Sequence, residues 1–513
     1  MLSALSLPKT QQKNTNPRHR DANTLGDWLA SLPLLNIQSS AAQVLDHLTQ
    51  LNASELDPKN RYALLQHYQR VIGELARVIQ PEQQADKKDL ATSKREIGFL
   101  QALHLELLNG LKLCLCDFDT ARFVLGRRPY VALLHDLMSA YLALMWTCYR
   151  AYAAFPESTW LQLHALFKFA VSKGIVDFAQ QQAAADQRIW PLYQEALLLA
   201  LVDPQAFSAV EQNQVRCIIQ NNLAAVSLKK IQEVTSQRNG FLLLLDQDLP
   251  PTVSNQVLGP ESGVVLWLET GALFNQLNRL IERIHQDSLR HGLKPDVPLA
   301  VWRRAARRFD SEASRSFERK HDSGHIEIVY GLRSACFYLN QQRPLVPPTE
   351  EGEVLSQAIV GRDFPLPQEW EISNVSPGGY ALRLDLGEQH LPCRVGDLLL
   401  AREFSRPRWM LAAVRWQTID LSAGSTEIGI EIISIAPEAA LIKPTQNYHA
   451  SYLHALALPE WKAKGSARML IAPRASFGPM RELTLHQLNA SAAIRASRLV
   501  EHSASYDLFE YFD

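Results

Sequence analysis

The chain has 513 residues, of which 47% are hydrophobic and 20% are charged, and its formal net charge is -1. This length suits about three domains with ordinary buried cores. A near-neutral chain has no overall attraction for nucleic acid or for an anionic membrane, so any anion site must be a local cluster of positive charge. The six cysteines are scattered without metal-ligand spacing, so we expect free thiols and no metal site.

The N-terminal residues have no features of a targeting segment. Residues 1–23 contain the polar run QQKNTNPRHRDAN and no apolar stretch, so we expect a disordered tail without a signal peptide. The longest apolar run, Leu137–Tyr149, is shorter than the ~20 residues that a membrane span needs. We therefore predict no transmembrane segment and a cytoplasmic protein.

Residues 24–238 predict an all-α domain, either a bundle or a repeat-like array. Segments such as AAQVLDHLTQL and RYALLQHYQRVIGELARVI place apolar residues three and four apart, which is the spacing of one helix face. No fixed internal period is evident. Nothing in this half suggests chemistry, so we expect it to contact a protein partner that the sequence does not name.

Residues 239–310 predict an α/β connecting region. FLLLLD and GVVLWLE are typical of short strands, and LFNQLNRLIERIHQ is typical of a helix. WRRAARR then reads as the end of a further helix, where positive charges suit the helix dipole. It begins a basic stretch from Arg303 to Lys320, which we expect to be mobile because it has few apolar anchors.

Residues 311–440 predict an antiparallel β-barrel. Alternating apolar residues mark HIEIVYG, WEISNVS, YALRLDL, DLLLARE, WMLAAVRW and EIGIEIIS as short, closely spaced strands. Residues 340–367 predict a loop inserted after the first strand. Strict alternation would place Arg415 and Trp416 on opposite barrel faces. Residues 441–513 predict a β extension of the same region, whose strands we pair with FLLLLD and GVVLWLE.

Two short motifs flank the first strands of this barrel. Arg315 and Arg319 form an RxxxR segment before HIEIVYG, and the segment Asn374-Val-Ser-Pro-Gly-Gly379 matches (D/N)xSxxG between two strands. The planar guanidinium of arginine binds phosphate through two donors and stacks on aromatic rings. Asn374 and Ser376 offer short polar side chains in a turn, and glycine allows close backbone approach to a ligand.

The combination resembles the PilZ family, over roughly Arg315 to Ile435, and a subgroup with a helical domain before the barrel. The resemblance implies an α+β protein: an N-terminal all-α helical bundle or array, then a PilZ-like antiparallel β-barrel with extra flanking strands. It also implies cyclic di-GMP as the ligand, bound by Arg315, Arg319, Asn374, Ser376, Gly378 and Gly379. Arg304 and Arg308 are secondary candidates, because WRRAARR also contains RxxxR spacing; Lys320, which follows Arg319, and Arg383, which follows the turn, are the others. The choice of arginine pair, the ligand stoichiometry and the oligomeric state stay open.

The function implied by the resemblance is a second-messenger receptor that passes the signal to a partner through its helical domain. No nucleophile elbow, Walker loop or dinucleotide fingerprint is present, so we expect neither an enzyme nor a bound cofactor. One alternative is a degenerate barrel that acts as a scaffold without the nucleotide. Nucleic-acid binding is disfavoured, because acidic residues interrupt the basic stretch at Asp310, Glu312 and Glu318.

Overall fold

The computed structural model divides into two compact units, and each is described by itself. The first comprises residues 1–204 and 209–314, and the second comprises residues 205–208 and 315–513. The structure describes residues 2, 5–10, 12–13, 16–19, 21–33, 36–79, 90–120, 128–176, 188–231, 240–253, 264–291, 297–311, 324–345, 364–386, 393–420, 423–446, 450–459, 468–488, 490–503 and 505–513. The predicted class, α+β with helices preceding an antiparallel barrel, is confirmed.

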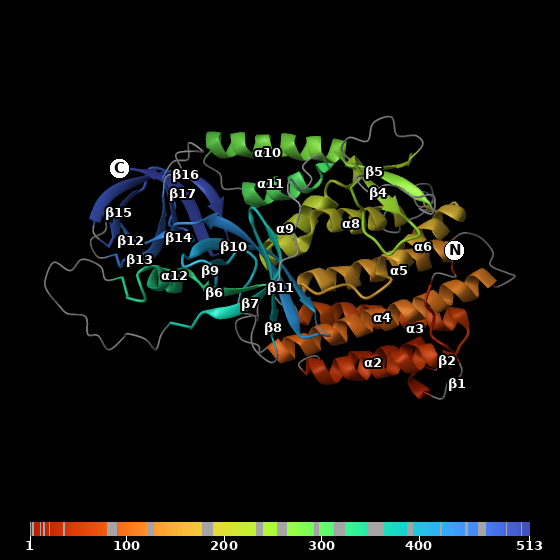
Figure 1. The fold of residues 1–513 in the computed structure, drawn as a ribbon. Helices are drawn as coiled ribbons and strands as arrows, with labels where there is room; N and C mark the ends of the chain where they lie inside the picture. The colour runs from red at the N-terminus through yellow and green to blue at the C-terminus, as the bar shows by residue number, and fades with distance from the viewer. Residues whose placement is uncertain are drawn as a thin grey trace. The chain divides into compact units, whose positions relative to one another are not determined.

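The first unit is built around a bundle of helices that lie side by side (Figure 1). Its helices are α1 (Ala22–Ala30), α2 (Ile37–Ala53), α3 (Pro58–Val78), α4 (Leu90–Thr120), α5 (Arg128–Arg150), α6 (Thr159–Ser172), α8 (Ile189–Val202) and α9 (Ala209–Gln220). The long helix α4 contacts α2, α3 and α5, so it forms the centre of the bundle. The apolar faces of these helices point into the bundle: Leu64 of α3, Leu103 of α4 and Leu144 of α5 are fully buried.

Two helical segments are long and apolar enough to cross a membrane by length and composition. They are Arg95–Thr120 within α4 and Tyr130–Arg150 within α5, and 61% of each apolar window is buried inside the unit. Burial against neighbouring helices is the behaviour of core helices in a bundle. The buried Lys112 of the first segment is matched inside the unit, because its amine donates to Gln162 Oε1 at 2.9 Å.

Part of the N-terminal segment that we predicted to be disordered is folded. β1 (Gln12–Lys13) pairs in parallel with β2 (Ser54–Glu55). Arg18 Nη1 lies 2.6 Å from His47 Nε2, and His19 is buried with its ring nitrogen 2.9 Å from the Tyr68 hydroxyl. The prediction was wrong for these residues because a polar composition does not exclude specific side-chain contacts with the bundle.

A small sheet and a helix pair complete the first unit. The sheet has the order β3 (Ser227–Lys230), β5 (Val265–Glu269), β4 (Gly240–Leu244), followed by α10 (Gly271–His291) and α11 (Leu299–Arg308). The two strands that we paired with the C-terminal strands therefore pair with each other, and that expectation was wrong. Asp248, in the loop after β4, accepts backbone N–H groups of Ser158, Trp160 and Leu161 and so caps α6.

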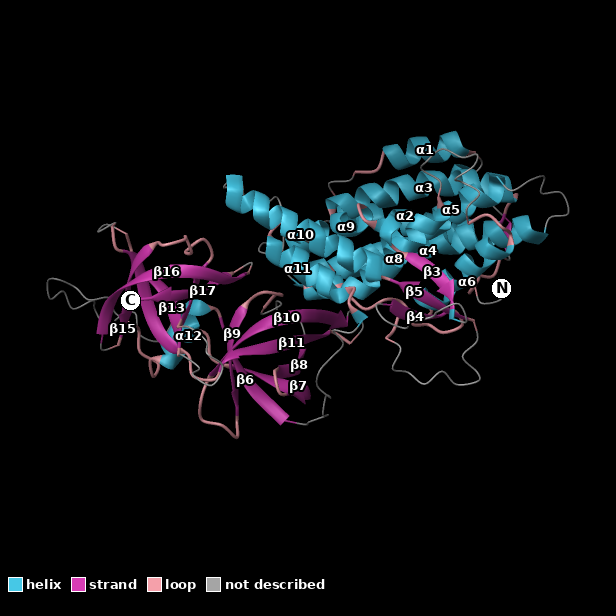
Figure 2. Ribbon diagram, turned by 90° about the horizontal axis from the view of Figure 1, so that it is seen from above, coloured by secondary structure: helices cyan, strands magenta, loops and turns pink. Residues whose placement is uncertain are grey.

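The second unit contains two closed six-stranded barrels, shown as magenta strands in Figure 2. The first barrel consists of β6 (Gly324–Tyr330), β7 (Gln368–Ser376), β8 (Gly379–Asp385), β9 (Leu398–Glu403), β10 (Met410–Asp420) and β11 (Ser425–Ser434). Its strand order is β10-β11-β8-β7-β6-β9. Ile326, Trp370, Leu382 and Ile428 are buried and fill its interior, and Ile326 and Trp370 lie between more exposed neighbours, as alternation along a strand requires.

The second barrel is a separate body of sheet, not an extension of the first. It consists of β12 (Glu438–Pro444), β13 (Leu453–Leu458), β14 (Met469–Pro473), β15 (Glu482–Gln487), β16 (Ala490–His502) and β17 (Tyr506–Phe512). These strands close in the order β12-β13-β14-β17-β16-β15. Its own core includes Ile442, Leu470, Ile494 and Phe509.

A short helix, α12 (Leu332–Leu339), follows β6 in the chain and packs between the two barrels. Cys336 and Phe337 of α12 belong to one buried cluster that also contains Leu411 of the first barrel and Ile471 of the second. The Cys336 thiol donates to Ala455 O at 3.2 Å. Because one apolar cluster spans all three elements, the two barrels pack as a single unit.

The predicted insertion, residues 340–367, begins directly after α12, and its last residues pack back against the same helix. The Phe337 ring stacks on Phe364 with centroids 4.0 Å apart, and the Tyr338 hydroxyl donates to Pro365 O at 3.0 Å. These contacts hold the two ends of the insertion together. Residues 346–363 lie outside the described part of the chain.

Candidate functional site

The (D/N)xSxxG motif forms the tight connection between β7 and β8. Asn374 and Ser376 lie at the end of β7, and Gly379 begins β8. Ser376 and Gly379 are register partners, and the Ser376 hydroxyl donates to Gly379 O at 3.2 Å. Asn374 is half-buried. Two short polar side chains are therefore fixed by strand pairing at one edge of the turn.

The two glycines of the motif have different structural roles. An added Cβ at Gly379 would lie 1.9 Å from Ile430 O, so only glycine fits between β8 and β11 at this position. A Cβ at Gly378 would meet no atom of the described residues within 4 Å, and Gly378 is exposed. Gly379 therefore serves the close approach of two strands, while Gly378 leaves open space beside the turn.

Asn374 belongs to a row of residues that crosses four strands on the outer barrel face. It pairs with Ala381 of β8, Ala381 pairs with Gly429 of β11, and Gly429 pairs with Trp416 of β10. Residues directly opposite on neighbouring strands share a face. A Cβ at Gly429 would lie 1.8 Å from Trp416 Nε1, so the half-buried indole lies over this glycine. The row thus runs from an amide to an aromatic ring across two small residues.

A β-bulge in β10 explains why Trp416 and Arg415 share this face. The register shifts between Val414 and Trp416, so Arg415 is an extra residue with no partner of its own in the β10–β11 register. Arg415 Nε donates to Glu431 Oε2 at 2.6 Å, on the same face of β11 as Gly429. The expectation that Arg415 and Trp416 lie on opposite faces was therefore wrong. A glycine in the middle of a strand, Gly429, was the sequence signal for such a close contact.

Arg383, a secondary candidate, lies on the same face but among carboxylates. Its side chain is 50% exposed, and Nε lies 3.7 Å from Asp385 Oδ1. Its register partners on the two neighbouring strands are Glu371 and Glu427. The positive charge of Arg383 is therefore largely offset by acidic neighbours.

The first-choice arginines Arg315 and Arg319, and Lys320, lie outside the described residues. What the structure gives is the point where their segment enters the barrel. β6 begins at Gly324, which pairs with Ile372 of β7, just before Asn374. Arg319 precedes Gly324 by five residues, a span of at most about 17 Å. The sequence separation therefore permits Arg319 to reach the turn.

The competing arginines lie on α11, in the other unit. Arg304 Nη1 donates to Glu211 Oε1 at 2.9 Å, and Arg308 Nη2 lies 3.7 Å from Asp203 Oδ2. Both arginines thus have acidic partners within the helical unit. Of the basic stretch Arg303–Lys320 that we expected to be mobile, the part up to Arg308 belongs to α11, whose Ala305 and Ala306 side chains are buried. Residues 312–320 lie outside the described residues.

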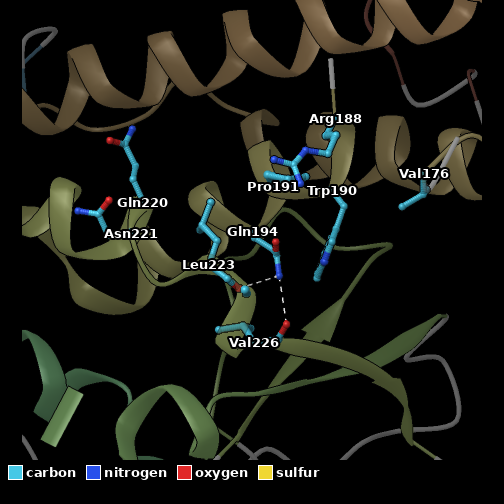
Figure 3. A pocket seen from close by; sticks show the side chains of 10 residues that line it. Val176, Arg188, Trp190, Pro191, Gln194, Gln220, Asn221, Leu223 and Val226 are labelled. Atoms are coloured by element: carbon cyan, nitrogen blue, oxygen red, sulfur yellow. Dashed lines mark hydrogen bonds between the residues drawn. The ribbon is translucent and has the colours of Figure 1, made fainter. Parts of the chain in front are cut away.

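The helical unit also contains a cavity of about 470 Å³ (Figure 3). The Gln194 side chain crosses it and donates to Leu223 O and Val226 O at 3.2 and 3.1 Å. Among its described lining residues Arg188 alone carries a charge, and Trp190 supplies an aromatic ring. One cation is a poor match for a ligand with two phosphates, so this cavity ranks below the β7–β8 turn.

Three family models match consecutive parts of the chain. Residues 23–233 match the N-terminal domain of the cyclic-di-GMP receptor FimW, residues 356–440 match its middle PilZ domain, and residues 439–513 match the FimW C-terminal beta-barrel domain. The PilZ match contains β7–β11 and the turn from Asn374 to Gly379. The last match corresponds to the second closed barrel.

A curated relative agrees with these matches. The chain is 24% identical to the cyclic-di-GMP receptor FimW of Pseudomonas aeruginosa, over 99% of this chain and 93% of the relative. The matched N-terminal domain and this relative are both described as belonging to a receptor. The order of helical domain, PilZ barrel and second barrel is the same in the matched models and in the structure. The chain therefore belongs to the PilZ-domain family, in the subgroup with an N-terminal helical domain.

Proposed function

We propose that this protein is a cyclic di-GMP receptor that binds the nucleotide on the outer face of the β6–β11 barrel. The carrying observation is the β7–β8 turn, where strand pairing fixes Asn374 and Ser376 beside the open space at Gly378. Amide and hydroxyl groups there can bond a guanine edge or a phosphate. The indole of Trp416, on the same face, offers an aromatic surface for a base.

The phosphates of the ligand need cations, and we propose Arg315 and Arg319 for this role. Their segment leads directly into β6, the strand that pairs with β7. The alternative pair, Arg304 and Arg308, has ion-pair partners inside the helical unit. Lys320 and Arg383 are proposed only as secondary contacts.

We further propose that the helical unit passes the signal to a protein partner. Residues 309–323 connect α11 to β6, so a ligand that orders Arg315 and Arg319 acts on the segment next to α11. α11 is fixed to its unit by the Arg304–Glu211 ion pair and by Thr270, whose hydroxyl donates to Phe309 O at 2.8 Å. An order–disorder step in the connecting segment can therefore change the position of α11, to which the segment is joined, and so pass the signal to the helical unit.

Calorimetric titration of cyclic di-GMP into the full chain tests the proposed site. We expect Arg315→Ala and Ser376→Ala to weaken binding at least tenfold, a loss of about 1.4 kcal/mol. Arg468→Ala and Ser405→Ala are matched controls, because Arg468 pairs with Asp513 on the second barrel and Ser405 bonds only Glu403 among the described residues. Loss of binding in Arg304→Ala, but not in Arg315→Ala, would assign the phosphate contacts to Arg304 and Arg308 instead of Arg315 and Arg319. Absence of binding by the wild-type chain would favour the scaffold alternative.

A further inference from the structure

Arg415 makes a charge cluster that connects the two barrels. Its Nε donates to Glu431 Oε2 of β11 at 2.6 Å, and Nη1 and Nη2 donate to the two carboxylate oxygens of Glu501 in β16 at 2.5 and 3.0 Å. The Tyr506 hydroxyl of β17 donates to Glu501 Oε1 at 2.7 Å. Burial lowers the pKa of Arg415, but Glu501 and Glu431 raise it more, so the net shift is upward and the guanidinium stays charged.

Glu431 lies beside the motif turn. It is the register partner of Gly379, and its Cα lies 3.2 Å from the position that a Cβ of Gly379 would occupy. The next residue, Ile432, donates its backbone N–H to Gly378 O at 2.9 Å. The Glu431 side chain is 57% exposed. A ligand with two phosphates at this turn would therefore meet a nearby carboxylate, which repels it.

We propose that Arg415 is a positioning residue of the nucleotide site, because it cancels the charge of Glu431 and holds that carboxylate away from the ligand. Glu501 and Tyr506 fix Arg415 in this position, so the C-terminal barrel contributes to nucleotide affinity. This inference rests on the proposed function, and it assigns the second barrel a part in binding. A bidentate arginine–carboxylate pair has the defined geometry that such a role needs.

A charge cycle separates this role from a purely structural one. Titration of cyclic di-GMP into the full chain at ~50 mM and ~500 mM salt compares wild type, Arg415→Gln, Glu431→Gln and the double variant. At ~7 Å and an effective dielectric constant of ~40, an unpaired carboxylate weakens phosphate binding roughly tenfold. We therefore expect Arg415→Gln to bind about tenfold more weakly at low salt, and the double variant to bind within about threefold of wild type. The deficit of Arg415→Gln narrows at high salt, because ions screen the exposed carboxylate.

Each other outcome overturns the proposal in a recognisable way. A double variant as weak as Arg415→Gln, or a deficit that salt does not change, would show that Arg415 only ties the barrels together. Glu431→Gln keeps the Arg415–Glu501 pair and so tests the idea without disturbing the joint: we expect binding equal to or tighter than wild type, and a tenfold loss overturns the inference. If wild type fails to bind cyclic di-GMP, the proposed function fails and this inference with it. If wild type binds but the double variant does not recover the affinity lost in Arg415→Gln, the inference alone fails.

Discussion

The glycine pair of the motif gives the sharpest test of the barrel geometry. Gly379→Ala places a methyl group 1.9 Å from Ile430 O, whereas an ordinary carbon–oxygen contact is over 1 Å longer. Strands β8 and β11 must separate locally, which strains the pairing of Gly379 with Glu431 and the Ile432 N–H bond to Gly378 O. Overpacking together with about one weakened backbone hydrogen bond amounts to ~2 to 4 kcal/mol.

Scanning calorimetry of the full chain measures this effect. For a unit of about 200 residues, ~1 kcal/mol lowers the melting temperature by ~2 to 4 °C, so Gly379→Ala should lower the barrel transition by roughly 5 to 15 °C. Gly378→Ala is the matched control, because its methyl group meets no atom within 4 Å in the described part of the chain, so it should shift the transition by less than about 2 °C. Equal melting temperatures for the two variants would refute the argument that β8 and β11 approach too closely for a side chain at position 379.

Two further predictions concern the helical unit. Asp248→Ala should lower its free energy of unfolding in urea by ~1 to 2 kcal/mol, because Asp248 caps three backbone N–H groups at the start of α6; an unchanged urea midpoint would contradict this assignment. Burial lowers the pKa of His104 and His164 to about 4. As pH falls from 6.5 towards 4, the unfolded chain binds protons that the folded chain does not, so stability falls with pH, by about 2 kcal/mol for each histidine at pH 5. A His104→Gln variant whose unfolding has the same pH slope as wild type would count against this explanation.

The strands of the first barrel could be predicted because alternation is a local signal. WEISNVS and YALRLDL correspond to β7 and β8, and the turn between them carries its own chemistry within six residues. The position of Asn374 and Ser376 at the end of a strand, next to a turn, could therefore be predicted without the fold. The bulge at Arg415 was not, because one extra residue in a strand leaves no distinct mark in an alternating pattern.

The second barrel and its contacts depended on long-range pairing. Alternation indicates which face of a strand is buried but not which strand is its neighbour, so FLLLLD was assigned the wrong partners. α12 has only eight residues and packs between the two barrels. Its helical form therefore depends on tertiary contacts more than on propensity. The contact between Arg415 and Glu501 could not be predicted, because the two residues are 86 positions apart in the sequence.

Hydrogen exchange of the full chain, with and without saturating cyclic di-GMP, tests the central claim most directly. The account predicts slower exchange of the backbone amides from Asn374 to Ala381, at the β7–β8 turn, and no change in β14 of the second barrel, whose pairing partners are β13 and β17. Unchanged exchange at the turn under saturating nucleotide would contradict a cyclic di-GMP site on this face of the barrel.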